Sequence, residues 1–538
     1  MNTLAQQLAK THNVPFADTF RYQYVVSERD LGLPGFHGCP IGAVVLQTGE
    51  ALKSQPLIDV NGVPFGCVIG VGVSHDGRSA ADYFCAAFDA NEPDAIAEFE
   101  DQLTRVSGRF AVVLHCQRQT RLYVDACGMI GAVFAPETRR VGATLGLCID
   151  REVVTPQLFQ DSPSAKPRAY GLHHTRDEAV YRLNPNHYLD LDTFKTHRFW
   201  PRAEDEFHLE RDAYAAAFDE LIDASANIID GLVRDHIISL PLSGGFDSRS
   251  IVAFARPESL RRLDQIFTHV LTWINLCDAS VANQLCAINN LGHETHNALR
   301  TRQFSGKRSP DAEEKQFQVA CANFEPSHRF VRDGAARRVM RDAVVLRGQQ
   351  MPILRGLFVS EADEAYWTSG RIAERVAGLL NFSEADDDGR DQIHQSVDAL
   401  YAELPEPARR RALDLLLVEA VNGPELSDWF CGVSHNFYSS PYNSRRLIQL
   451  FSSFHTVDRK SGLAMDLALL RASPVVKTVA MTPKVKTVQW AEDDNSVRQR
   501  LRRLNRLRRE YARIFGEESA DLPMIRYRRD GVIEYCKL

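Results

Sequence analysis

Residues 236–254 read HIISLPLSGGFDSRSIVAF, and this stretch decides the fold of the second half of the chain. The mostly apolar residues 236–242 predict a strand buried in a parallel sheet, and residues 248–255 predict a helix. Between them lies SGGFDS, at the position where an open α/β sheet binds its ligands. Further along, FTHVLTW, DASVANQLCAINNLG and DAVVLRG read as strand, helix and strand. This alternation predicts an α/β domain with a mainly parallel sheet.

The SGGFDS loop has the composition of a phosphate-binding site. Its two glycines lack a Cβ, so phosphate oxygens can approach the backbone, and the helix N-terminus supplies positive potential. Its aspartate would repel phosphate unless it holds Mg²⁺, which bridges to the phosphate oxygens. A Gly-Gly turn with helix-capping side chains is the plain structural alternative, and no Walker GK[ST] motif is present. The expected ATP ligands in the loop are Ser243, Gly244, Gly245, Asp247 and Ser248, with Asp247 as the metal ligand.

The first ~200 residues predict antiparallel β structure, in runs bounded by Gly, Pro and Asn. Three runs at 109–116, 121–126 and 131–135 read as consecutive strands of one antiparallel sheet. The segments QRQT and CGMI between them are short enough for hairpin turns. Further strands are expected from Tyr22, from Ile41, from Gly66 and at 186–192.

The composition changes near residue 200, where FWPRAEDEFHLERD is polar and contains a proline. Apolar residues then recur at helical spacing from Tyr214 to Val233. A chain of 538 residues is too long for a single core, so two domains are expected. The predicted division is an N-terminal domain at 1–200, a linker at 201–212, a second domain at 213–490 and a basic helical extension at 491–538.

Composition excludes several classes of protein. Hydrophobic residues make up 44% and charged residues 25%, and the net charge is -7, as in an ordinary globular protein with no sign of nucleic-acid binding. The 11 cysteines form no CxxC pair, which argues against paired-cysteine zinc sites and a disulfide framework. A reducing cytoplasm fits this cysteine pattern. No apolar stretch of about 18 residues and no signal-peptide core are seen, so no membrane span is expected.

The motifs resemble those of one known family. PLSGGFDSRS resembles the PP-motif of the ATP pyrophosphatases, and specifically that of the asparagine synthetase family. Residues 105–134 resemble that family's glutaminase domain, with its D-x-x-G turn at Asp125–Gly128. PYNSRRLIQLFSSF resembles its late P-F-x-D-x-R-L-x-E segment, with Arg446 at the arginine. The motif SGGFDSR, which includes Arg249, is most similar to that of the asparagine synthase-related branch of the family. β-Lactam synthetases and lasso-peptide cyclases resemble the chain more distantly.

This resemblance implies a fold and a reaction. The implied fold is a degenerate glutaminase-like Ntn-type αββα domain, followed by an ATP pyrophosphatase domain of the adenine nucleotide alpha hydrolase-like kind. The implied reaction adenylates a carboxylate with Mg²⁺-ATP, releases pyrophosphate and lets an amine displace AMP. By resemblance, Leu271 or Thr272 lies nearest the adenine and Gly348 lies near the α-phosphate. Lys484 would stabilise charge during acyl transfer, the alternative being a solvated surface lysine.

Two departures from the family pattern matter. The family's glutaminases carry a cysteine directly after the initiator methionine, whereas Asn2 follows Met1 here and the first cysteine is Cys39. Because a thiolate must attack the amide, we expect no glutamine hydrolysis. Cleavage before Cys39 would expose a terminal cysteine; a buried thiol at a strand edge is the alternative we favour.

The second departure is RGQQMPILRG, residues 347–356, which replaces the family's acidic G-x-G-x-D-E loop. It supplies no carboxylate, so a second Mg²⁺ ligand must come from elsewhere, with Asp278 and Glu325 as weak candidates. Arg355, and with less support Arg347, offer guanidinium forks that suit phosphate. An ordinary loop salt bridge is the alternative for these arginines.

The C-terminal segment Arg498–Arg513 contains eight arginines among leucines at 501, 504 and 507. This pattern predicts an amphipathic helix that packs its leucines on the body of the protein. Docking to an anionic partner such as a carrier protein or tRNA is the sharper alternative, and binding to a membrane surface is a third.

The expected function is an ATP-dependent, AMP-forming amide ligase that acts on a small-molecule carboxylate and on ammonia or an amine. A genuine asparagine synthase is the first alternative. A non-catalytic descendant that binds a nucleotide or a partner is the second, favoured by the missing carboxylate in residues 347–356. A sulfur-transfer or tRNA-modifying pyrophosphatase is the third, and the absence of a CxxC pair argues against it. A homodimer is left open.

Overall fold

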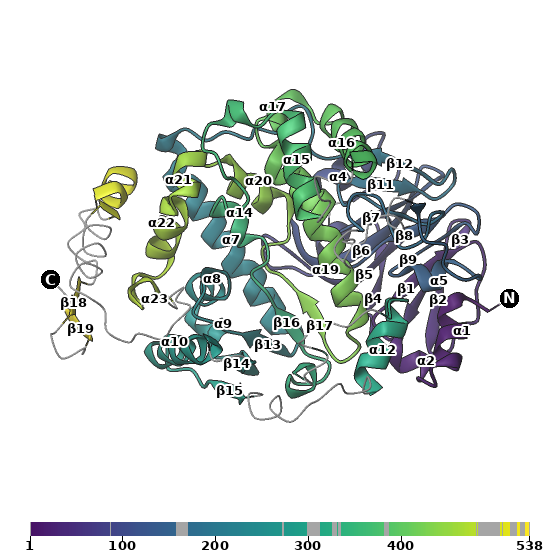
Figure 1. Ribbon diagram of the computed structural model, residues 1–538, viewed down its shortest axis with the longest axis horizontal. Helices are drawn as coiled ribbons and strands as arrows, with labels where there is room; N and C mark the ends of the chain where they lie inside the picture. The colour runs from purple at the N-terminus through teal and green to yellow at the C-terminus, as the bar shows by residue number, and fades with distance from the viewer. Residues whose placement is uncertain are drawn as a thin grey trace.

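The computed structural model shows a mixed α/β protein (Figure 1). The N-terminal half contains two antiparallel sheets, and the C-terminal half contains a parallel five-stranded sheet with helices. The predicted change from an antiparallel to a parallel half is therefore confirmed. The structure describes residues 2–86, 88–157, 170–271, 274–297, 312–324, 331, 335–380, 387–479, 481, 506–507, 509–516, 524–527 and 533–536.

The two N-terminal sheets have six strands each. The first has the order β10 (Tyr181–Arg182), β8 (Val133–Ala135), β9 (Arg140–Gly142), β1 (Tyr24–Ser27), β3 (Val44–Gly49) and β2 (Phe36–Ile41). The second has the order β12 (Lys195–Arg198), β11 (His187–Asp190), β7 (Gln119–Val124), β6 (Val106–Cys116), β5 (Pro64–Ser74) and β4 (Ser54–Ile58). Helices α1 (Leu4–Thr11), α2 (Phe16–Thr19), α3 (Ala80–Cys85), α4 (Ala95–Thr104) and α5 (Leu145–Cys148) complete this half.

One predicted hairpin is wrong. β6 and β7 pair as expected, but the strand at 133–135 belongs to the other sheet, so CGMI is no hairpin turn. The reason lies in Asp125, whose buried carboxylate accepts the backbone N–H groups of Cys127 (3.2 Å), Met129 (2.9 Å) and Ile130 (2.9 Å). These bonds fold the segment around a side chain and direct the chain into the first sheet.

Strand β13 (Ile238–Pro241) lies at the centre of the parallel sheet. The apolar run at 236–242 predicted a buried strand in a sheet of this kind. The strand order of the sheet is β15 (Glu294–Asn297), β14 (Gln265–Val270), β13, β16 (Val344–Leu346) and β17 (Phe437–Ser439). Helix α7 (Tyr214–Asp235) precedes β13, and α8 (Phe246–Phe254), α9 (Pro257–Leu260) and α10 (Ile274–Ile288) follow it in the chain. The SGGFDS loop therefore joins the carboxyl end of the central strand to the start of α8.

Helices fill most of the remaining described chain: α12 (Ala312–Ala320), α14 (Met351–Leu354), α15 (Ser369–Leu379), α16 (Asp387–Ala402), α17 (Glu406–Arg409), α18 (Ala412–Leu417), α19 (Gly423–Gly432), α20 (Arg445–Ser453), α21 (Thr456–Lys460), α22 (Leu463–Ala472) and α23 (Pro474–Thr478). A π-helix, Val418–Asn422, joins α18 to α19. The acidic sequence of residues 383–391, SEADDDGRD, predicts an exposed loop, but residues 387–391 begin α16, and 383–386 lie outside the described residues.

The predicted linker is packed rather than free. Residues 201–210 form neither helix nor strand, as expected, but Trp200 and Phe207 are buried. The N–H of Leu209 donates to the carbonyl of Ser453 at the end of α20, 3.1 Å away. One apolar core also includes residues of both halves. The two halves are therefore held together by burial as well as by the covalent connection.

The C-terminal extension is helical only in part. Residues 509–515 are helical, and Leu507 and Tyr511 are buried against the main core, as predicted for the apolar face of an amphipathic helix. Leucines 501 and 504 lie outside the described residues. An antiparallel hairpin of β18 (Met524–Tyr527) and β19 (Ile533–Cys536) was not predicted; it lies at the far side of Figure 1 from α1. Within the described chain, no helix is both long and apolar enough to span a membrane.

Candidate functional site

A cavity of about 860 Å³ opens at the carboxyl edge of the parallel sheet. Its volume is in the range of small-molecule and cofactor sites. The second half of the chain contributes Ser243, Asp247, Ser248, Leu271, Arg347, Gly348, Trp429 and Tyr438 to its wall, and the first half contributes Cys127, Thr144, Arg176 and Arg182. The fold thus brings the predicted loop together with Leu271 and Gly348, from segments far apart in the sequence.

Other predicted residues lie elsewhere. Gly244, Gly245 and Arg355 are not among the residues that line the cavity. Thr272 and Lys484 lie outside the described residues, so the structure does not place the predicted adenine contact of Thr272 or the predicted catalytic lysine.

Three backbone N–H groups of the SGGFDS loop, which the sequence predicted to bind phosphate, donate hydrogen bonds to side chains of the protein. The N–H of Ser243 donates to Ser248 Oγ (3.0 Å), and the N–H of Gly245 donates to Ser243 Oγ (3.3 Å). The N–H of Gly244 donates to Asp278 Oδ1 (3.2 Å). These three groups are therefore already paired. Helix α8 has nine residues and no side-chain cap, so the N–H groups of its first turn, rather than those of the glycines, are the place for an anion.

Asp247 stands in the first turn of α8 and faces two arginines. Its Oδ1 lies 3.5 Å from Nη1 of Arg355, and this oxygen is buried without a hydrogen bond. The side chain as a whole is 45% exposed, toward the cavity. Burial raises the pKa of Asp247 above its ordinary value, and the charges of Arg355 and Arg347 act in the opposite direction. A carboxylate in the wall of a cavity fits a Mg²⁺ ion that shares its other ligands with phosphate.

Arg355 forms a salt bridge with Asp247. A loop salt bridge of this kind was the alternative to a contact with phosphate. The Arg355 guanidinium also lies 4.6 Å from the ring centre of Phe246, so the loop itself holds the arginine. The weak second metal candidate, Asp278, accepts from Gly244 and from Asn275 Nδ2 (3.2 Å), and so supports the loop. Glu325 lies outside the described residues.

Arg347 is the cation that lines the cavity. Its N–H donates to the carbonyl of Ser439 (2.8 Å), which ties the end of β16 to β17. Its guanidinium lies 5.4 Å from the ring centre of Trp429. Burial lowers the pKa of Arg347, partly offset by Tyr438 and Asp247, yet an arginine remains charged near neutral pH. The sequence favoured Arg355 over Arg347 as a phosphate ligand, whereas in the structure Arg347 lines the cavity and Arg355 does not.

Residues 347–356 connect the cavity to the first half of the chain. The buried amide of Gln350 donates to Cys127 Sγ (3.3 Å) and accepts from Ser440 Oγ (2.6 Å). Nearby, Asn443 donates to the Asp125 carboxylate (2.6 Å), the side chain that shapes the 125–130 turn. The segment that lacks the expected carboxylate therefore forms part of the contact between the two halves.

The two arginines singled out by resemblance are structural. Arg446 pairs with Glu220 of α7 through two bonds of 2.7 Å and does not line the cavity. Arg249 is 1% exposed and lies behind the loop. It donates to the carbonyls of Gly244 and Val476 (3.4 Å each) and to that of Val479, and so fixes the loop to α23.

Comparison with known proteins adds no further identification. No protein-family model matches the chain, and a search of curated proteins finds no match. The function is therefore inferred from the chemistry of the cavity and from the motifs around it.

Proposed function

We propose that the chain is an ATP-dependent, AMP-forming amide ligase of asparagine-synthetase type. One observation carries the proposal: the SGGFDS loop joins the central strand β13 to α8 and places the 45% exposed side chain of Asp247 in the wall of a cavity of about 860 Å³. The two antiparallel sheets followed by a parallel sheet also support the proposed pairing of a degenerate Ntn-type domain with an ATP pyrophosphatase domain.

The nucleotide would lie across the loop. Its phosphates approach the first turn of α8, where the uncapped N–H groups, Ser248 Oγ and the Arg347 guanidinium supply positive potential. Asp247 would hold Mg²⁺, which neutralises phosphate charge when bound. The adenine would lie beside Leu271, whose N–H donates to Asn275 Oδ1 (3.3 Å). Lys484 is proposed to stabilise the charge that develops in acyl transfer.

Nucleotide binding requires Asp247 and Arg355 to separate. The two side chains neutralise one another across 3.5 Å in the absence of a ligand. With Asp247 holding a metal ion, Arg355 would lose its carboxylate partner and could pair with a phosphate oxygen, which suits its planar fork. In this proposal Arg355 exchanges one anionic partner for another.

The acyl acceptor would enter from the side of the first half. There the cavity is lined by Arg182 and Asp428, which pair at 2.9 Å, and by the aromatic side chains of Tyr170 and Trp429. The proposed acceptor is ammonia or a substrate amine, because burial raises the thiol pKa of five described cysteines of the first half, Cys67, Cys85, Cys116, Cys127 and Cys148.

The test is product analysis. The full chain is incubated with Mg²⁺-ATP, ammonium and a panel of carboxylic acids that includes aspartate, and nucleotides and pyrophosphate are quantified. The proposal predicts AMP and pyrophosphate in equal amounts, released only with the correct acid. Asp247→Asn abolishes the release, whereas Asp398→Asn, on the exposed face of α16, leaves it unchanged. Formation of ADP and phosphate instead would contradict the proposal.

A second function has one observation in its favour. The Asp247–Arg355 pair occupies the predicted metal ligand, and residues 347–356 supply no replacement carboxylate. A non-catalytic descendant would bind ATP through the same loop but release no pyrophosphate with any acid. If aspartate alone triggers release, the enzyme is a genuine asparagine synthase.

A further inference from the structure

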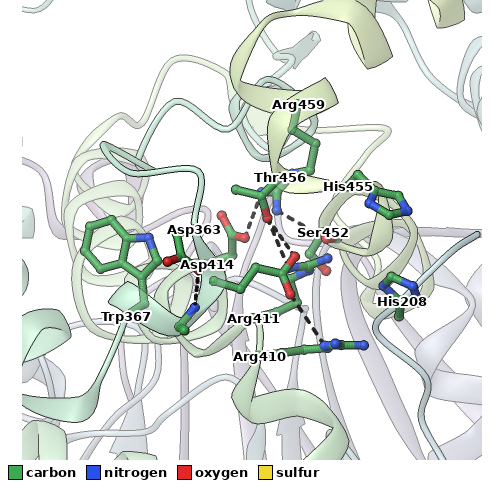
Figure 2. Close-up of polar contacts among 12 residues, drawn as sticks. His208, Asp363, Trp367, Arg410, Arg411, Asp414, Ser452, His455, Thr456 and Arg459 are labelled. Atoms are coloured by element: carbon green, nitrogen blue, oxygen red, sulfur yellow. Dashed lines mark hydrogen bonds and ion pairs between the residues drawn. The ribbon is translucent and has the colours of Figure 1, made fainter.

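A second cluster of metal-ligating side chains lies where the linker crosses the corner between α20 and α21. His208 and Glu210 belong to the linker, and His455 immediately precedes α21. Figure 2 shows the two imidazoles near one another at one edge of a polar network that includes Arg410 and Arg411. One ligand atom from each of the three residues lies within 4.8 Å of the others; within the described part of the chain this is the one such group found.

The hydrogen bonding of this cluster is incomplete. His208 Nε2 lies 2.8 Å from Glu210 Oε1, and the two imidazole centres are 5.1 Å apart. His208 Nδ1 and His455 Nε2 are both buried and have no hydrogen-bond partner among the described residues. Buried polar atoms are rarely left unpaired, so two of them in facing histidines point to a missing ligand.

The backbone holds the three residues in place. The N–H of Leu209 donates to the carbonyl of Ser453 (3.1 Å), which fixes the linker beside the end of α20. The N–H of His455 donates to the Tyr214 hydroxyl (2.9 Å) on α7. Phe207, next to His208, is fully buried. The ligands are therefore positioned by contacts that do not depend on the cluster itself.

The charges around the cluster suit a cation. Glu210 is the acidic member of the cluster, with its Oε1 2.8 Å from His208 Nε2 and its side chain 72% exposed. Arg410 is the competing positive group, but its Nε lies 3.6 Å from the Glu364 carboxylate. That carboxylate also accepts from Thr456 (3.0 Å) and pairs with Arg411. Arg410 is thus partly neutralised by Glu364.

We propose that His208, Glu210 and His455 bind a divalent transition metal of the Zn²⁺ class, which fixes the linker to the α20–α21 corner. Two imidazoles and a carboxylate are typical ligands for Zn²⁺, Co²⁺ or Ni²⁺, whereas Mg²⁺ prefers oxygen ligands. Ligands of a tetrahedral Zn²⁺ ion are about 3.3 Å apart, so the widest separation must shorten. The Glu210 side chain is 72% exposed and free to make that movement, and water completes the coordination.

The experiment uses the full chain, freed of metal with a chelator, and titrates it with Co²⁺ alone. The proposal predicts one equivalent of Co²⁺ with the intense visible absorption of a four-coordinate ion, displaced by Zn²⁺. His455→Ala and Glu210→Gln each weaken binding by at least about tenfold. His37→Ala, which removes an exposed histidine of β2, leaves binding unchanged.

Two outcomes would overturn the proposal. One is a Co²⁺ spectrum and affinity that are the same in Glu210→Gln as in the parent; this side chain is exposed, so its removal preserves the fold. The other is the absence of any four-coordinate Co²⁺ spectrum in the parent protein. Asp247→Asn is expected to leave Co²⁺ binding unchanged, so the result is independent of the proposed nucleotide site.

Discussion

Gly348 lies directly against the backbone of Asp247. A Cβ added to Gly348 would fall 2.2 Å from the carbonyl oxygen of Asp247 and 2.6 Å from its carbonyl carbon. Both obstacles are backbone atoms, which cannot move aside as a flexible side chain can. The end of β16 and the first turn of α8 can therefore meet only where a glycine occupies position 348.

Gly348→Ala is expected to displace the first turn of α8, and with it Asp247 and Ser248. We predict that the affinity for Mg²⁺-ATP falls at least tenfold, and that the free energy of unfolding falls by about 1–3 kcal/mol. Isothermal titration calorimetry and urea denaturation measure the two effects. The matched control is Gly378→Ala in α15, where no atom lies within 4 Å of the added Cβ. The control should be neutral or stabilise by up to about 1 kcal/mol, with unchanged ATP affinity. Equal ATP affinity in both variants would show that the contact has no role in binding.

The lowered pKa of Glu419 predicts that the protein loses stability in acid. It is fully buried between the halves and accepts from Arg198 (2.8 and 3.0 Å), Asn186 (2.7 Å) and Asn184 (2.9 Å). Burial alone would raise its pKa, but Arg198 and the two amides outweigh burial and lower the pKa from 4.5 to about 2. Because the folded pKa is below the unfolded one, the contribution is complete above about pH 4.5 and disappears as the pH falls toward 2. Its size is about 3 kcal/mol.

Glu419→Gln should therefore lower the free energy of unfolding at pH 7 by about 3 kcal/mol, since it leaves Arg198 with a weaker buried partner. The slope of stability against pH between about 5 and 2 should also become shallower. Urea denaturation across this range measures both effects, with the exposed Glu258→Gln as the control. An unchanged slope would mean that Glu419 does not titrate as proposed.

Glutamine should not serve as the nitrogen source. The thiols of Cys67, Cys127 and Cys148 are buried, and burial raises the pKa of each to about 12, so the reactive thiolate is absent at neutral pH. Cys39 is a half-buried thiol on β2, the edge strand of the first sheet, as the strand-edge interpretation expected. We predict no release of glutamate from glutamine, while ammonium supports product formation. Glutamate release that disappears in Cys39→Ser would reverse this conclusion.

Lys484 is predicted to act after adenylation. Lys484→Met should retain exchange of labelled pyrophosphate into ATP with the correct acid, but should lose at least 100-fold in formation of the amide, because the missing charge acts on the second step. The neighbouring Lys486→Met is the control. Equal product rates in both variants would favour the interpretation of Lys484 as a surface lysine.

Local patterns explain what could be predicted from the sequence. The apolar run before SGGFDS and the helical spacing after it depend on neighbours in the chain, and β13 and α8 follow them closely. The sheet to which 133–135 belongs was mispredicted, because it depends on three backbone groups that bind the Asp125 carboxylate. Strand propensity carries no information about such a turn.

Contacts between distant segments explain what could not be predicted. Gly348 meets Asp247, and Gln350 meets Cys127, across long separations in the sequence. The sequence predicted that the N–H groups of the loop bind phosphate. In the structure they donate to Ser243, Ser248 and Asp278, and these bonds could not be predicted because they form only in the folded loop. His208 and His455 have no common motif, and only the packing of the linker brings them together.

The most direct test of the central claim is a crystal structure of the full chain with Mg²⁺ and an ATP analogue that cannot be cleaved between the α- and β-phosphates. The account predicts phosphates at the first turn of α8, a metal ion bound to Asp247, and Arg355 moved from Asp247 to a phosphate oxygen. A structure obtained at saturating analogue in which the cavity is empty, with the Asp247–Arg355 pair intact, would contradict the account.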